Sequence, residues 1–366
     1  MPHLPIHTQV VIVGAGQAGL SVAYFLKRFE LEPGVDFVVL DRGPRPGGAW
    51  QHRWSALTLG SAHRVADLPG MDQLGLSFAT ADHHRPAKEV VDEYYGRYED
   101  HFGLQVFRPV EVMSVFNRGA DLVVNARVPD EHDPDYREEI VTRLLVNASG
   151  TWRAPFVPYV PGIRDFAGEQ LHTSGYRSAD DYRDKSVVVV GGGTSAIGFL
   201  LELEGVAGAL AWATRRPVDF SDDEKLTTEG GVRAVAAQDE AARAGLPLPS
   251  IVHATAVAKT RRIAGGIERG VLVARPMFTR IERDGVRWPD GSFTRADVII
   301  WATGFRPELR HLAPLRLHNP GGGVTVQNGA AAADPRIFLA GYGPQASTIG
   351  ANRAGRAVAR QVIAAL

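Results

Sequence analysis

The chain has 366 residues, 45% of them hydrophobic and 22% charged, which is the composition of a folded protein with a large core. Lys and Arg number 40 against 41 Asp and Glu, so the net charge of −1 gives no sign of nucleic-acid or anionic-membrane binding. Cysteine is absent, which excludes disulfides, thiolate metal sites and a redox-active cysteine pair. Without a signal-peptide pattern in Met1–Thr8 or an apolar run of roughly 18 residues, a cytoplasmic protein is expected.

The first predicted unit is a strand, a glycine-rich turn and a helix. Val10–Val13 is a continuous apolar run typical of a parallel strand covered on both faces, and Gln17–Phe29 is predicted as a helix. The G-x-G-x-x-G turn between them allows a tight turn, close approach of a pyrophosphate and close packing of helix on strand. The nucleotide contacts predicted here are Gly14, Gly16, Gln17, Ala18 and Gly19.

An acidic residue completes this pattern. The next strand, Phe37–Leu40, ends in Asp41, which lies 22 residues after Gly19, where a carboxylate can accept hydrogen bonds from a ribose hydroxyl. Asp41 and the adjacent Arg42 are therefore predicted cofactor contacts. Because strand, turn, helix, strand and acid occur in order, the segment predicts a dinucleotide-binding fold with the pyrophosphate at the helix N-terminus.

The pattern changes between Arg108 and Arg143. Val110–Phe116, Asp121–Val128 and Glu139–Leu145 predict a small antiparallel meander with short turns between its strands. A further apolar run, Leu144–Ala148, leads into a glycine and predicts a return to the parallel sheet.

A second strand, glycine turn and helix follow at Ser186–Val190 and Ser195–Leu203, with alanine in place of the last glycine of the turn, an accepted variant. The next strand, Leu210–Ala213, leads into two arginines where an NAD site would carry an acid. Arginines suit the 2′-phosphate of NADP, so NADPH is favoured, with NADH as the alternative. The contacts predicted here are Gly191, Gly193, Thr194, Ser195, Ala196, Arg215 and Arg216.

The stretch Ser221–Gly270, after the second glycine turn and its arginines, is predicted as helix and surface loop. Val298–Ala302 and Ile337–Ala340 are further strands ending at glycines, and Gly350–Ala365 is the last predicted helix. The fold class is therefore α/β, with two Rossmann-like dinucleotide-binding domains, the second inserted into the first. The predicted FAD domain spans 1–155 and 297–366, with Val298–Gly304 among its strands, and the predicted NAD(P) domain spans 156–296.

Two dinucleotide sites on one chain predict internal electron transfer, in which a nicotinamide delivers hydride to a flavin. The N-terminal turn is assigned to FAD, because the flanking strands can complete its domain. The second turn is assigned to NADPH, because it lies within a stretch that can form an inserted domain.

Three further motifs give the chain a family resemblance. Gly47–Trp50 reads G-G-A-W, Phe166–Tyr176 reads F-A-G-E-Q-L-H-T-S-G-Y, and Ala302–Phe305 reads A-T-G-F. With the two glycine turns, these motifs make the chain similar to the flavin-containing monooxygenases, the class B flavoprotein monooxygenases, and above all to their short bacterial members. The resemblance implies that the His of the second motif, His172, couples the domains rather than transferring a proton. Flavin contacts are expected at Gly48, Ala49, Trp50, Thr303, Gly304, Gly341, Gln345, Ser347 and Thr348.

The resemblance also implies an activity. NADPH would reduce FAD, and a peroxyflavin formed with O2 would pass one oxygen atom to a sulfide or amine, as in sulfoxidation, or insert it beside a ketone, as in Baeyer–Villiger oxidation. A small-molecule substrate, O2 and a homodimer are the partners expected; no catalytic side chain or metal is assigned. One departure is Gly60, which aligns with an Asn of the well-known members. It leaves open an alternative, an NADPH oxidase or electron-transfer reductase that yields hydrogen peroxide.

Overall fold

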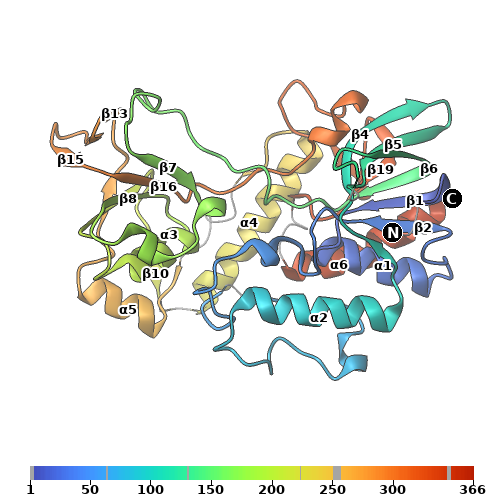
Figure 1. The fold of residues 1–366 in the computed structure, drawn as a ribbon, viewed down its shortest axis with the longest axis horizontal. Coiled ribbons are helices and arrows are strands. Elements are labelled where there is room, and N and C mark those ends of the chain that lie inside the picture. Colours follow the sequence, from blue (N-terminus) through green and yellow to red (C-terminus); the bar gives the residue numbers. More distant parts are fainter. Residues whose placement is uncertain (1–3, 63–64, 130–131, 223, 250–256, 344–347) are drawn as a thin grey trace.

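Two β-sheets lie side by side and divide the protein into two halves (Figure 1). The computed structural model describes residues 4–366 apart from 63–64, 130–131, 223, 250–256 and 344–347. The helices are α1 (Gln17–Arg28), α2 (Ala87–Phe102), α3 (Thr194–Leu203), α4 (Glu224–Ala244), α5 (Arg261–Glu268) and α6 (Thr348–Ala365). Among the described residues, none of these helices is long and apolar enough to cross a bilayer.

The first sheet has nine strands among the described residues, in the order β17-β18-β19-β6-β1-β2-β3, with β5 joined to β6 and β4 to β5. β1 pairs in parallel with both β2 and β6, as continuous apolar strands do in doubly covered sheets. The strands are β1 (His7–Val13), β2 (Phe37–Leu40), β3 (Val106–Phe107), β4 (Glu111–Arg118), β5 (Asp121–Arg127), β6 (Arg137–Asn147), β17 (Val326–Gln327), β18 (Ala330–Ala331) and β19 (Asp334–Leu339).

Both faces of the first sheet are buried. Val10 and Ile12 of β1 lie in a core formed with α1, α2 and α6, whereas Val11 and Val13 lie in a second core beneath β4 and β5. The run Val10–Val13 is therefore apolar at every position, because successive side chains enter different cores.

The second sheet has five strands among the described residues, in the order β12-β9-β8-β16-β7. Val187 and Val189 of β8 pack with α3, and Val188 and Val190 pack in a core with Trp288 beside a small antiparallel sheet. The remaining strands are β7 (Glu169–His172), β8 (Ser186–Val190), β9 (Ala209–Thr214), β10 (Phe220–Ser221), β11 (Val257–Ala258), β12 (Ala274–Pro276), β13 (Arg280–Glu282), β14 (Gly285–Arg287), β15 (Phe293–Arg295) and β16 (Val298–Trp301).

The α/β class with two parallel sheets is confirmed, and so is the predicted meander of β4, β5 and β6. The runs Glu139–Leu145 and Leu144–Ala148, predicted as two strands, are one strand, β6. Its first residues pair antiparallel with β5 and its last residues pair in parallel with β19, while β1 lies along its other edge.

The placement of Val298–Gly304 in the first domain is wrong. β16 lies between β8 and β7 in the second sheet, where Ala302 N–H donates to Val190 O at 2.8 Å. Ala148 N–H donates in the same way to Val13 O at 2.8 Å in the first sheet. The A-T-G segment is thus the second domain's counterpart of Ala148–Gly150. The other limits given above for the two domains stay a prediction.

The segment Ser221–Gly270 forms α4 and α5, which confirms its helical part; residues 250–256 lie outside the described residues. Although α4 belongs to the inserted stretch, its residue Ala242 lies in the core of the first half, beside Tyr342. Figure 1 shows α4 running between the two halves.

Candidate cofactor-binding site

The first glycine turn is built by backbone contacts that a side chain would block. Gly14 has φ +102°, and a Cβ on it would lie 2.5 Å from Ala148 O, while a Cβ on Gly19 would lie 1.9 Å from Gly14 O. A Cβ on Gly48 would lie 2.8 Å from the Cα of Gly16, so the G-G-A-W segment lies directly against the turn. The glycines therefore leave a cradle of the kind that a pyrophosphate needs.

The start of α1 fits an anion. Its N-cap, Gly16, makes no side-chain cap, and the first turn carries no acidic residue. The N–H groups at this end are thus available to phosphate oxygens. The side chain of Gln17 donates instead to Ala66 O at 2.7 Å, so only its backbone remains a candidate contact. Ala18 lies beside Gly341, whose added Cβ would be 3.3 Å from the Ala18 Cβ, so the end of β19 reaches this turn.

Asp41 lies at the end of β2 as predicted, and it is 8% exposed. Its Oδ1 accepts from Gly43 N–H at 3.2 Å and its Oδ2 accepts from Arg108 Nε at 3.1 Å. Arg108 also donates two hydrogen bonds to Glu99, at 2.6 and 2.7 Å. Burial raises the pKa of Glu99, and the Arg108 guanidinium opposes this shift. Each Asp41 oxygen retains a lone pair for a ribose hydroxyl; Arg42 reaches Glu111 at 3.7 Å.

The G-G-A-W segment forms the short 3₁₀ helix η1 (Gly48–His52), in which Ala49 is exposed and Trp50 is buried in the first core. The guanidinium of Arg53 lies 5.7 Å from the Trp50 ring centre and 4.3 Å from that of Trp152. Burial lowers the pKa of Arg53 to about 10. Arg53 and Trp152 carry no motif that would have marked them in the sequence.

The second turn repeats the first. Gly191 N–H donates to Ala213 O at 2.9 Å, as Gly14 N–H donates to Leu40 O at 2.8 Å. A Cβ on Gly191 would lie 2.2 Å from Ala302 O. Gly193 begins α3 without a side-chain cap. Thr194 is exposed, Ser195 is half-buried and Ala196 is buried against the core.

Arg215 and Arg216 are both exposed directly after β9. β9 is the neighbour of β8, so the two arginines follow the strand beside the one that leads into the second turn. This is where the family pattern places the 2′-phosphate of NADP. The residues of both turns therefore fit dinucleotides, and their individual contacts stay predictions.

A pair of crossing segments joins the two halves. Phe156 N–H donates to Gly304 O at 3.0 Å, and Arg306 N–H donates to Ala154 O at 2.7 Å. The Thr303 hydroxyl donates to Phe156 O, so it is occupied within the junction. Gly304 is thereby placed in the junction rather than in the first sheet.

His172 belongs to the same junction. Its Nε2 lies 2.9 Å from Gly304 O, which requires a proton on this nitrogen, and its ring meets Phe305 edge-on at 4.7 Å. Burial lowers the pKa of His172 to about 4, so the ring is neutral at physiological pH. These contacts agree with a coupling role for this residue. Gln345 and Ser347 lie outside the described residues, as does the side chain of Thr348.

Gly60 lies in an exposed turn in which its N–H donates to His83 O at 2.9 Å. A Cβ here would lie 3.1 Å from His83 O, which is a tight contact. Glycine therefore fits this turn better than the asparagine that aligns with it in the well-known members of the family.

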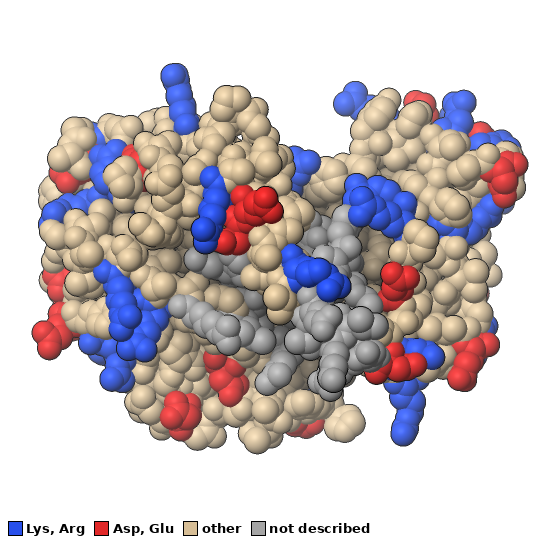
Figure 2. Space-filling model, turned by 180° about the vertical axis from the view of Figure 1, so that it is seen from behind, with Lys and Arg blue, Asp and Glu red and all other residues tan. Residues whose placement is uncertain are grey.

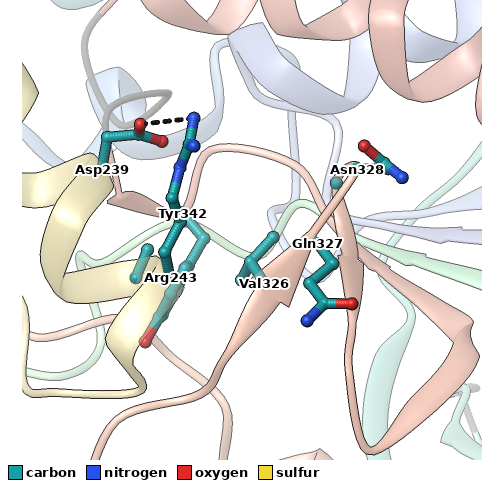
Figure 3. Close-up of a pocket in the computed structure, with 8 residues that line it drawn as sticks. Asp239, Arg243, Val326, Gln327, Asn328 and Tyr342 are labelled. Carbon is teal, nitrogen blue, oxygen red and sulfur yellow. Dashed lines mark ion pairs between the residues drawn. The ribbon is translucent and has the colours of Figure 1, made fainter.

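A cavity of about 490 Å³ lies between α4 and the turn joining β17 to β18 (Figure 3). Asp239 and Arg243 form an ion pair at 2.8 Å on its helical side. Its lining includes none of the predicted cofactor contacts, so we separate it from the site. The lining residues are Asp239, Ala242, Arg243, Val326, Gln327, Asn328, Gly329 and Tyr342.

Comparison with known proteins agrees with this geometry. The profile of the pyridine nucleotide-disulphide oxidoreductase family matches residues 11–229. A double mutant of the flavin monooxygenase from Stenotrophomonas maltophilia superimposes with a TM-score of 0.80 at 33% identity, over 98% of this chain and 99% of that one. A solved structure of the flavin-containing monooxygenase from the same organism gives a TM-score of 0.76 at 31% identity, with the same coverage.

Curated relatives match less completely. The oxidoreductase CzcO of Bacillus velezensis is 30% identical over 57% of this chain and 56% of its own length. The chain thus spans about half the length of the first curated relatives that it matches. Because the family profile covers more than half of the chain, and the Stenotrophomonas enzyme matches throughout, the chain belongs to the flavin-containing monooxygenases, within the pyridine nucleotide-disulphide oxidoreductases.

Proposed function

We propose that the chain is a monooxygenase that uses FAD and NADPH to transfer one oxygen atom of O2 to a small sulfide, amine or ketone. The observation that carries this proposal is the pair of equivalent glycine turns, each beside an A-x-G segment, with the G-G-A-W segment lying against the first. A relative named indole-3-pyruvate monooxygenase, from Oryza sativa subsp. japonica, supports oxygen transfer; it is 28% identical over 82% of this chain and 74% of its own length.

When bound, a flavin reduced by NADPH activates O2 and supplies the oxygen atom. The protein's part is to bind and orient the cofactors and the substrate, and to exclude water from the site. In our proposal the first turn and the start of α1 hold the FAD pyrophosphate, and Asp41 accepts from its ribose. The second turn and the start of α3 hold the NADPH pyrophosphate, and Arg215 and Arg216 bind its 2′-phosphate. His172, neutral and hydrogen-bonded to Gly304 O, holds the halves together.

A second candidate is an NADPH oxidase or electron-transfer reductase that releases hydrogen peroxide. Gly60 favours it, because glycine offers no side-chain amide where the family carries asparagine. A reductase that serves an acidic electron carrier needs a basic docking face. On the face shown in Figure 2, blue and red side chains are interspersed, and the net charge is −1. These observations favour the monooxygenase.

The function is tested by mixing the purified protein, NADPH, O2 and thioanisole, and measuring sulfoxide and hydrogen peroxide against NADPH consumed. Amines and ketones are tested in the same way. We expect an oxygenated product to account for a substantial share of the NADPH for at least one class. Peroxide alone across the whole panel would contradict the monooxygenase and support the oxidase.

The cofactor preference is tested at Arg215. Arg215→Ala should lower kcat/KM for NADPH roughly 10- to 150-fold, because a charged hydrogen bond to phosphate is lost. This corresponds to a loss of about 1.5–3 kcal/mol in transition-state stabilisation. NADH, which lacks that phosphate, should lose little. Arg183→Ala, which removes an exposed arginine from the same half, is the control. Equal losses with both nucleotides would refute the 2′-phosphate assignment.

A further inference from the structure

Trp54 follows the G-G-A-W segment of the first half, yet its side chain lies in the core of the second half. It is 4% exposed and packs with Tyr176 and Phe199, at ring-centre distances of 5.6 and 5.0 Å. Trp50, only four residues earlier, lies in the core of the first half. The short segment between these two tryptophans therefore has one end fixed in each half.

The side chain of Trp54 is hydrogen-bonded to a carboxylate, that of Glu202. Trp54 Nε1–H donates to Glu202 Oε1 at 2.9 Å, and the Tyr176 hydroxyl donates to Glu202 Oε2 at 3.2 Å. Each carboxylate oxygen thus has one partner of its own. Burial raises the pKa of Glu202, and the two hydrogen bonds oppose the shift by favouring the charged form. A charge-assisted bond to a partly buried carboxylate is among the stronger and more directional contacts in proteins.

Trp54 and Glu202 belong to segments that adjoin the two glycine turns. Glu202 is on α3, the helix that begins at the second glycine turn. Trp54 follows η1, whose first residue, Gly48, lies against Gly16 of the first glycine turn. One hydrogen bond therefore connects the segment beside the first glycine turn to the helix that begins at the second.

We propose that Trp54 and Glu202 are positioning residues, which fix the flavin turn relative to the pyridine-nucleotide turn so that hydride transfer occurs at the correct distance. The inference rests on the proposed use of NADPH to reduce the flavin. Misplacement of reacting groups by about 1 Å can cost on the order of a hundredfold in rate, so one contact between the cradles can be decisive.

The chain offers a matched pair of variants. Trp54→Phe and Tyr176→Phe each retain an aromatic ring and each remove one donor from Glu202. The Trp54 bond crosses between the halves, whereas the Tyr176 bond lies within the second half. Comparison of the two separates the crossing contact from the loss of a hydrogen bond to Glu202 as such.

The first measurement is flavin reduction by NADPH without oxygen, followed by stopped-flow absorbance. We expect the limiting rate to fall at least tenfold in Trp54→Phe and less than threefold in Tyr176→Phe. The dissociation constant for NADPH should stay within twofold of the wild type in both, because the second turn itself is unchanged. Glu202→Leu, which keeps a side chain of similar size but offers no acceptor to Trp54 Nε1–H, should reproduce the rate loss of Trp54→Phe.

The second measurement needs no turnover. Because the chain contains no cysteine, spin labels attach only at introduced Asp100→Cys on α2 and Glu268→Cys on α5, both exposed positions. The distance distribution between these labels should broaden or shift in Trp54→Phe and remain that of the wild type in Tyr176→Phe. Equal behaviour of the two variants in rate and in distance would overturn the proposal. If NADPH fails to reduce the wild-type flavin, the proposed function falls, while the label distances still test the contact.

Discussion

Gly48 and Gly16 come from different motifs, yet their backbones meet at the first turn. Gly48→Ala would place a Cβ 2.8 Å from the Gly16 Cα, and neither backbone can give way without opening the cradle. We expect the variant to lose most of its flavin, measured as the ratio of flavin to protein absorbance. Gly119→Ala is the control, because Gly119 also has a left-handed φ, +62° against +53°, but nothing lies within 4 Å of its Cβ.

The control should cost only the left-handed backbone penalty of about 1–2 kcal/mol in a urea melt, and it should retain its flavin. A flavin content of Gly48→Ala equal to that of the control would mean that the Gly16–Gly48 contact is not part of the flavin site.

Single residues also show which parts of the site the sequence could predict. The glycines of both turns were predictable, because their constraint is local: a strand, a turn with positive φ and a helix in order. Arg108 and Glu202 were not, because each acts through a partner far along the chain, Asp41 for Arg108 and Trp54 for Glu202. No spacing rule marks such pairs.

At the level of strands and helices, one element was assigned to the wrong sheet. β16 and the last residues of β6 are both apolar runs that end in A-x-G, and each lies beside a glycine turn in the same way. The duplicated architecture makes the two segments interchangeable in sequence. Only the strand pairing shows which sheet each one joins. The strands themselves were predictable, because both faces of each sheet are covered and the apolar runs are continuous.

A buried ion cluster of Arg108, Asp41 and Glu99 connects α2 to the first sheet. Arg108, 12% exposed, bonds Asp41 and Glu99, so Arg108→Met would leave two buried carboxylates without their cation. We expect a loss of about 3–5 kcal/mol in the free energy of unfolding at pH 7, measured by urea denaturation. Arg183→Met is the control, because Arg183 and Asp180 form an exposed pair, which should be worth about 1 kcal/mol or less. Similar losses in both variants would show that the cluster is not a stabilising tie.

For the whole molecule, two buried histidines make neutral polar contacts, one in the junction between the halves and one within the first half. His172 bonds Gly304 O in the junction, and His311 lies 2.8 Å from Asn147 Oδ1 at the end of β6. Both rings are buried, at 8% and 6% exposure, and burial lowers the pKa of each to about 4. The unfolded chain titrates near 6.5, so protons bind the unfolded state more readily between these values.

The stability of the protein should therefore fall as the pH falls from about 6.5 to about 4. Each histidine contributes stability that is present above pH 6.5 and is lost on the way to its folded pKa, up to about 3 kcal/mol apiece. Urea melts at pH 7, 5.5 and 4.5 measure this slope. His172→Gln keeps a donor for Gly304 O but cannot take up a proton, so it should flatten the slope, and the double variant with His311→Gln should flatten it further. An unchanged slope in the double variant would show that other groups govern the acid stability.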